Sequence, residues 1–191
     1  MSSESLVSRP SLAQPGYTTK TGFTFPSIHN FPPFFTAQPT LSTWEDQSSL
    51  WATVILAYYK HHRLYKLELN EAVSGGSELF ANPRIKRSAE WDTAGATGKQ
   101  PQKTQCFIHW RKPEEWANYI SSWASDNGMN NSILTLYELA NGDSSEGTDL
   151  HEIDTTVLLK ALDVLVKRGV AQIFAGTSDP ESVGVKFFGI S

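Results

Sequence analysis

The sequence predicts an α+β protein in which two small domains of the same kind follow each other along the chain. Two observations support this prediction. The order of helices and strands expected in the second half is partly repeated in the first, and a proline-bearing boundary at residues 111–113 separates the halves. The 191 residues, of which 39% are hydrophobic and 19% charged, suffice for two cores and are typical of globular proteins.

The second half gives the more complete pattern. Pro113 suits the first turn of a helix, Thr135–Glu138 is a capping box that begins a second helix, and Asp154 caps a third. Helices are therefore expected over 113–128, 135–141 and 154–169, and strands over 132–134, 171–175 and 183–188. Three helices followed by a β hairpin are the arrangement of a winged-helix domain.

The first half begins in the same order and then departs from it. Ser42–Glu45 is a second capping box, and one face of the helix that follows carries Trp44, Trp51, Ile55, Tyr58 and His62. A strand is expected over 66–69, a short helix over 77–87, and strands over 89–93 and 105–110. No room is left for another helix between the short helix and the strand at residue 89. We therefore expect a first winged helix over 41–111 that lacks its third helix, and a complete one over 112–191.

Two segments precede the first domain. Residues 1–22 are rich in Ser, Thr, Pro and Gly and are expected to form a flexible tail. Residues 23–40 form an arm that combines prolines with phenylalanines, a composition that excludes a regular helix but is unusual for a disordered linker. The segment Phe31–Phe35 within it either folds back on its own domain or docks in a groove of a partner, and the residues alone favour neither.

Charge argues against a nucleic-acid partner. The formal net charge is −4 and the sequence pI is near 5.7, whereas contacts with phosphate groups require a basic surface. The outer positions of the third helix of the second half mix both signs, with Lys160, Asp163, Lys167 and Arg168. A winged-helix DNA-binding regulator is therefore the alternative, less favoured function. The N-terminus lacks an apolar signal core, and no stretch approaches the roughly 20 apolar residues of a membrane span, so that a cytoplasmic location is expected.

No active site, metal site or cofactor is predicted. His61 and His62 are adjacent, and adjacent side chains on a helix point about 100° apart. Cys106 is the single cysteine, which excludes an intrachain disulfide. It is expected to pack as a small apolar residue, on the other face of its strand from His109.

Four stretches of the chain resemble one protein family. They are FPPFFTAQP (31–39), WRKPEEW (110–116), NNSILTLYELANG (130–142) and GVKFF (184–188). Their order and spacing, from about residue 23 to residue 188, are similar to those of the small subunit of the ESCRT-II complex, in a fungal-type form. Measured against that family, roughly twenty residues are missing beside Ala89, which is the length of a helix plus its turn.

The resemblance implies a protein without enzymatic activity that links the larger ESCRT-II subunits to ESCRT-III. Its process would be the multivesicular body sorting of ubiquitinated membrane proteins, with recruitment to the endosomal membrane through the complex. Two copies of the chain would each bind one of two larger subunits, and this favours docking of the arm. The residues expected to bind the larger subunits are Phe31, Pro32, Pro33, Phe34 and Phe35. The ESCRT-III contact is expected at Leu134, Thr135 and Glu138 of the second winged helix.

Overall fold

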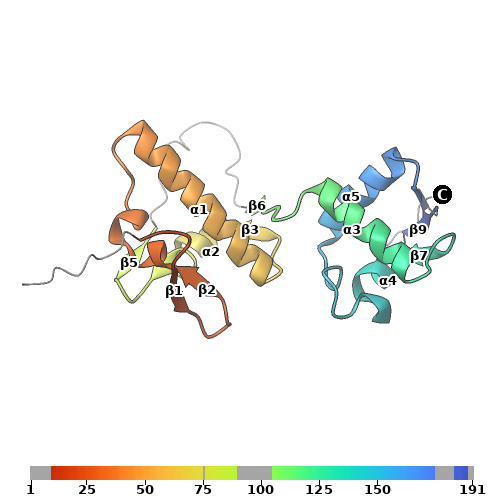
Figure 1. Ribbon diagram of the computed structural model, residues 1–191, viewed down its shortest axis with the longest axis horizontal. Coiled ribbons are helices and arrows are strands. Elements are labelled where there is room, and N and C mark those ends of the chain that lie inside the picture. Colours follow the sequence, from red (N-terminus) through yellow and green to blue (C-terminus); the bar gives the residue numbers. More distant parts are fainter. Residues whose placement is uncertain (1–9, 75, 90–104, 175–182, 189–191) are drawn as a thin grey trace, which may run out of the picture. The chain divides into compact units, whose positions relative to one another are not determined.

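The computed structural model describes residues 10–74, 76–89, 105–174 and 183–188. Its packing divides the chain into two compact units, Met1–Trp110 and Arg111–Ser191, whose helices and strands are labelled in Figure 1. The described residues of the predicted tail and of the arm belong to the first unit, so that they are parts of this unit and not separate segments.

The second unit has the predicted element order of a winged-helix domain. Its elements are α3 (Pro113–Asp126), β7 (Ile133–Thr135), α4 (Leu136–Asn141), the 3-10 helix η4 (Asp143–Ser145), α5 (Thr155–Lys167), β8 (Ala171–Phe174) and β9 (Gly184–Phe187). The three strands form one antiparallel sheet in the order β7-β9-β8, and Val185 at its centre pairs with Leu134 on one side and Ile173 on the other. The predicted complete second winged helix is confirmed.

Local capping sets the ends of these helices. The Thr135 hydroxyl accepts a hydrogen bond from the Glu138 N–H at 3.1 Å, and the Glu138 carboxylate accepts one from the Thr135 N–H at 2.7 Å. The Asp154 carboxylate accepts from the Thr156 N–H at 2.8 Å and starts α5. Gly128 follows α3 with a φ of +66°, a conformation that costs glycine little because it has no Cβ.

The core of the second unit lies where α5 packs along α3. α3 contributes Trp116 and Ile120, and α5 contributes Leu158, Leu162 and Leu165, each at most 1% exposed. Burying a side chain of this size stabilises a fold by about 1.5–3 kcal/mol. The pairing of these two helices is therefore the main source of stability in this unit.

The first unit repeats part of this plan. Its elements are β1 (Pro15–Thr18), β2 (Thr24–Pro26), the 3-10 helices η1 (Ser27–Asn30) and η2 (Pro32–Phe35), α1 (Leu41–His61), β3 (Lys66–Glu68), α2 (Leu69–Val73), β4 (Ala81–Asn82), β5 (Arg87–Ser88) and β6 (Gln105–Phe107). The order α1-β3-α2 matches α3-β7-α4, and β3 pairs with β6 as β7 pairs with β9. In the described part of this unit no α-helix follows α2.

The prediction of a short helix over 77–87 is wrong. That stretch holds β4 and β5, which pair with each other around a turn in which the Lys86 N–H donates to the Pro83 carbonyl. Pro83 cannot donate a helical hydrogen bond, and the Asn82 side chain bonds to the backbone of His29 instead of capping a helix. The short helix of this unit is α2, which directly follows β3. Residues 90–93, predicted as a strand, lie outside the described residues.

Two further expectations for the first unit are corrected. Residues 15–18, predicted as part of a flexible tail, form β1 and pair with β2. α1 begins at Leu41 with Thr40 as its cap, because the Thr40 hydroxyl accepts from the Thr43 N–H, so that Ser42 lies inside the helix. Trp44, predicted on one face with Trp51 and Ile55, is 49% exposed, and the buried residues of α1 are Gln47, Val54 and Tyr59.

Candidate protein-binding surfaces

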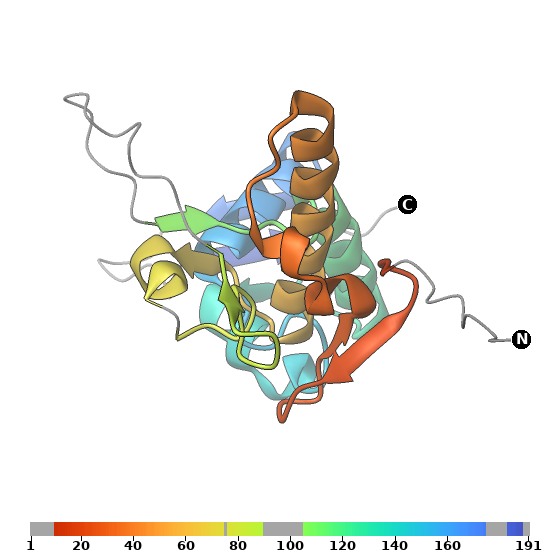
Figure 2. The same cartoon turned by 90° about the vertical axis from the view of Figure 1, so that its left-hand side faces the viewer.

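The aromatic arm is folded against its own domain and leaves one edge open. Phe34 and Phe35 are 3% and 8% exposed, whereas Phe31 is 39% exposed and Pro32 and Pro33 are exposed as well. Figure 2 shows the turn that carries them beside α1. The folded-back interpretation therefore describes Phe34 and Phe35. Phe31, Pro32 and Pro33 are the members of the predicted binding segment that remain accessible to a partner.

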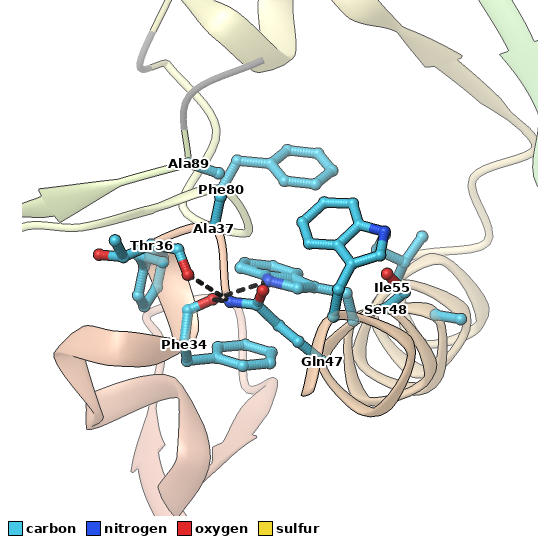
Figure 3. Close-up of a pocket in the computed structure, with 12 residues that line it drawn as sticks. Phe34, Thr36, Ala37, Gln47, Ser48, Ile55, Phe80 and Ala89 are labelled. Atoms are coloured by element: carbon cyan, nitrogen blue, oxygen red, sulfur yellow. Dashed lines mark hydrogen bonds between the residues drawn. The ribbon is translucent and has the colours of Figure 1, made fainter. Parts of the chain in front are cut away.

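Two side chains of α1 hold the arm in place. The amide nitrogen of Gln47 donates to the carbonyls of Phe34, Thr36 and Pro33 at 2.7, 2.9 and 3.2 Å. The indole nitrogen of Trp51 donates to the same Phe34 carbonyl at 2.9 Å (Figure 3). The Trp51 ring stacks on the Phe34 ring, with centroids 4.2 Å apart and planes 12° apart. The Phe34 carbonyl therefore accepts from two side chains of α1, which satisfies a buried backbone acceptor of the arm.

A buried histidine connects the arm to the rest of the core. His29 is 0% exposed, and its ring stacks on Phe25 with centroids 3.9 Å apart. Its Nε2 lies 2.9 Å from the Leu79 carbonyl, which can only accept, so that Nε2 carries the proton and Nδ1 faces the Tyr17 hydroxyl and the Asn82 amide. Burial lowers the pKa of His29, and the hydrogen bond to Leu79 offsets part of this effect. The neutral ring is a structural element of the core.

The open edge of the arm borders a shallow hollow. Phe31 and Pro33 line it together with Leu50 and Asp46, and its volume is about 180 Å³. A hollow between an exposed aromatic ring and an apolar side chain can receive a side chain of a partner. Phe31 therefore has the exposure and the surroundings of an interface residue.

The three residues predicted for the second surface lie together where β7 ends and α4 begins. Leu134 is half-buried and pairs with Val185 in the sheet. Thr135 and Glu138 form the capping box, and the Glu138 carboxylate also accepts from the Thr135 hydroxyl at 2.9 Å. The structure thus gives Thr135 and Glu138 a local structural role, while Glu138 remains exposed.

Two apolar side chains beside this group were missed from the sequence. Ile133 is 62% exposed and Tyr137 is 54% exposed, and β7 is an edge strand of its sheet. Tyr137 also lines a hollow of about 290 Å³ together with Ala140 and Asp154. Successive side chains of a strand point to opposite faces, so Ile133 lies on the other face of β7 from Leu134, which pairs with the buried Val185. Exposed apolar side chains of this kind mark protein-binding surfaces when they cluster.

The residues weighed for catalysis are not brought into a site. Cys106 is exposed, so the expectation that it packs as a core residue is wrong. Cys106 lies on β6, opposite Leu67 of β3, in a sheet of two strands among the described residues. Among the described side chains, no group of three or more His, Cys, Asp or Glu residues is placed to hold a metal ion.

Two basic residues at the C-terminal end of α5 are engaged within the second unit. Lys167 forms an ion pair with Asp163 at 2.6 Å, and Arg168 donates to the Asn118 side chain at 2.6 Å. This mixed surface agrees with the weak case for DNA binding made from the sequence. No helix in the described ranges combines the length and the apolar character that crossing a membrane requires.

One family model and several known proteins match this chain. A model of the family described as "ESCRT-II complex subunit" matches residues 28–154, which is more than half of the chain. The chain belongs to this family. It is 38% identical to vacuolar protein-sorting-associated protein 25 of Dictyostelium discoideum, with 88% of this chain and 97% of the relative covered. For the Danio rerio protein of the same name the identity is 39%, with 87% and 99% covered.

Solved structures agree with the sequence relatives. The crystal structure of subunit VPS25 of the endosomal trafficking complex ESCRT-II is similar with a TM-score of 0.68 and 26% identity, covering 84% of this chain and 97% of that one. A crystal structure of the ESCRT-II complex VPS22/VPS25/VPS36 contains a chain similar with a TM-score of 0.67. The chain is therefore a small ESCRT-II subunit of endosomal trafficking with two tandem winged helices, and the DNA-binding alternative is not favoured.

Proposed function

We propose that this chain is a non-catalytic subunit through which ESCRT-II joins its two larger subunits to ESCRT-III. The observation that carries the first half of this proposal is the open edge of the arm. Phe31 is 39% exposed beside two exposed prolines, on a segment that Gln47 and Trp51 hold rigidly. A preorganised aromatic edge binds with little loss of conformational entropy. A similar chain is part of a solved ESCRT-II complex described as VPS22/VPS25/VPS36, and this supports larger ESCRT-II subunits as the partners of the present chain.

The arm has two functional parts in this proposal. Phe34 and Phe35 are its anchor in the first unit, and Phe31, Pro32 and Pro33 insert into the larger subunit. Each complex would hold two copies of the chain, one on each larger subunit. In this proposal the chain supplies binding surfaces, and its contribution to the complex is the geometry of assembly.

The ESCRT-III contact is proposed for the second unit. It comprises Leu134, Thr135 and Glu138, extended by the exposed side chains of Ile133 and Tyr137. Apolar contact by the two exposed residues would provide most of the affinity, since aromatic side chains are frequent hot spots. The charge of Glu138 would orient a basic partner surface. The complex would bring the chain from the cytoplasm to the endosomal membrane, for multivesicular body sorting of ubiquitinated membrane proteins.

Affinity purification of the tagged chain from its source cells tests this function. Mass spectrometry should identify two larger ESCRT-II subunits in the wild-type sample, and much less of both with Phe31→Ala. A chain that purifies without larger ESCRT-II subunits would contradict the proposal. Nanomolar binding to duplex DNA that weakens steeply with salt would instead favour the regulator function.

A further inference from the structure

The first unit carries a wide apolar hollow along one side of α1. Its volume is about 520 Å³, and its wall includes Trp44, Trp51, Ala52 and Ile55 of α1, Phe80, and Ala89 after β5. None of the described residues that line it is charged (Figure 3). An apolar concavity of this size is typical of binding sites.

The second unit contains a helix, α3, that can be compared with α1 and its hollow. α1 and α3 end in the same turn: the Leu64 N–H donates to the Tyr59 carbonyl at 2.9 Å, and the Met129 N–H donates to the Ala124 carbonyl at 2.8 Å. The residue before each donor has a positive φ, of 53° in Arg63 and 66° in Gly128. This shared turn aligns the two helices without a gap.

The alignment pairs identical residues. Trp51, Ala52 and Ile55 of α1 correspond to Trp116, Ala117 and Ile120 of α3. In the second unit these three positions are at most 1% exposed, in the helix along which α5 packs. In the first unit Trp51 and Ile55 are only half-buried and Ala52 is exposed.

The two units differ in the element that covers this surface. In the second unit α5 follows α4 and lies on α3. In the first unit the described residues after α2 form β4, β5 and β6, and none of them forms a helix that would correspond to α5. The hollow is thus bordered by Trp, Ala and Ile side chains whose counterparts in the second unit are buried in the helix that packs along α5.

We propose that this hollow is a docking site for one amphipathic helix of another polypeptide, with an apolar face like that of α5. In α5 the buried residues are Val157, Leu158, Ala161, Leu162 and Leu165, which occupy one stripe of the helix. From Trp44 to Ile55 the hollow extends about 16 Å along α1, and a helix of the length of α5 spans about 20 Å. Recognition of an amphipathic helix by an apolar groove is a recurring mode of protein binding.

A buried acceptor in the wall adds one polar requirement. Gln47 is 7% exposed, and its side-chain oxygen is buried with no hydrogen-bond partner among the described residues. Leaving a buried acceptor unpaired costs stability. The docked helix would therefore carry one donor side chain, such as Ser, Thr, Asn or Lys, at the end of its stripe that lies near Gln47.

A labelled peptide tests the proposal with the full-length chain. The probe is a fluorescein-labelled peptide with the sequence of residues 154–169, DTTVLLKALDVLVKRG, and the readout is its fluorescence anisotropy during titration with the protein. Saturable binding is expected. The same peptide with Leu158→Asp and Leu162→Asp has lost its apolar stripe and should not bind.

A matched pair of variants locates the site. Ala52→Glu places a carboxylate in the hollow, which must lose its hydration on docking, and should weaken binding by at least about tenfold. Ala57→Glu makes the same change at another exposed alanine of α1 that lines a different hollow, and should leave binding unchanged. Circular dichroism should show that both variants keep the wild-type helix content, because both positions are exposed.

Several results would overturn the proposal. One is the absence of saturable peptide binding to the wild-type chain, and another is equal weakening by both variants. Sedimentation velocity that shows a wild-type dimer, dissociated by Ala52→Glu, would assign the hollow to a second copy of the chain. Binding of the apolar dye ANS at this site, without any competition from the peptide, would assign it to small apolar molecules.

Discussion

Phe31 and Phe34 are three residues apart in the arm, and the structure predicts opposite consequences for their replacement by alanine. Phe34 is 3% exposed and stacked on Trp51, so Phe34→Ala leaves a cavity and should cost about 3–5 kcal/mol of unfolding free energy. Domains of this size have about 5–15 kcal/mol in total. The first unit should therefore lose a large part of its stability. Phe31 is 39% exposed, and Phe31→Ala should cost only about 1–2 kcal/mol.

Binding should show the reverse order. If Phe31 inserts into a larger ESCRT-II subunit, Phe31→Ala should weaken that contact by about 2 kcal/mol or more, which is roughly 30-fold in Kd. The assay is calorimetric titration of the larger subunits, with urea unfolding followed by tryptophan fluorescence to measure stability. Phe174→Ala is the matched control, because Phe174 is 38% exposed on β8 and lies outside the arm.

Two outcomes would refute this reasoning. Equal binding by Phe31→Ala, Phe174→Ala and the wild type would show that the open edge of the arm is not the contact. Wild-type stability of Phe34→Ala together with weakened binding would show that Phe34 leaves its core position to enter the partner.

Three further predictions concern other parts of the molecule. Burial lowers the pKa of His29, so the unfolded chain binds a proton at this residue more tightly than the folded chain does. The first unit should therefore lose stability as the pH falls below about 6.5. Urea midpoints that do not decrease from pH 7.5 to about 5.5 would contradict this. Asp154→Ala removes the cap of α5 and should cost about 1 kcal/mol by thermal unfolding, whereas Asp154→Asn should keep most of it. Tyr137→Ala and Glu138→Gln should each weaken binding of the ESCRT-III subunit with an unchanged thermal midpoint, because Tyr137 is exposed and Gln can keep the capping box; wild-type affinity in both would place the contact elsewhere.

The second winged helix was predictable because its signals are local. Pro113, the capping box at Thr135–Glu138 and the cap at Asp154 each act within four residues, and the structure confirms all three helices that they begin. Trp116, Ile120 and Trp123, which α3 buries, also recur at the spacing of one helical face. Local capping and periodicity were sufficient here because no distant segment competes for these backbone groups.

The first unit was less predictable because distant residues decide its local structure. The stretch around Pro83 forms two short strands, and Asn82 is held by His29, more than fifty residues earlier in the sequence. The arm is held by Gln47 through carbonyls of residues 33–36. The composition of an apolar segment does not show whether it packs in its own core or in that of a partner. Only the structure separates buried Phe34 from exposed Phe31.

The residues proposed for the ESCRT-III contact on the second unit were also predictable only in part. The sequence prediction named Leu134 and the two capping residues, and the structure shows that the exposed apolar side chains beside them are Ile133 and Tyr137. Which face of a three-residue strand is covered depends on the sheet and helices around it. Exposure of single apolar residues cannot be read from so short a pattern.

Native mass spectrometry of the reconstituted complex tests the central claim most directly. The full-length chain is co-expressed with the two larger ESCRT-II subunits, and the intact assembly is weighed after gel filtration. We expect one species that contains two copies of this chain and one copy of each larger subunit, and we expect its loss with Phe31→Ala but not with Phe174→Ala. Larger subunits that assemble without this chain, or a complex that Phe31→Ala leaves intact, would contradict it.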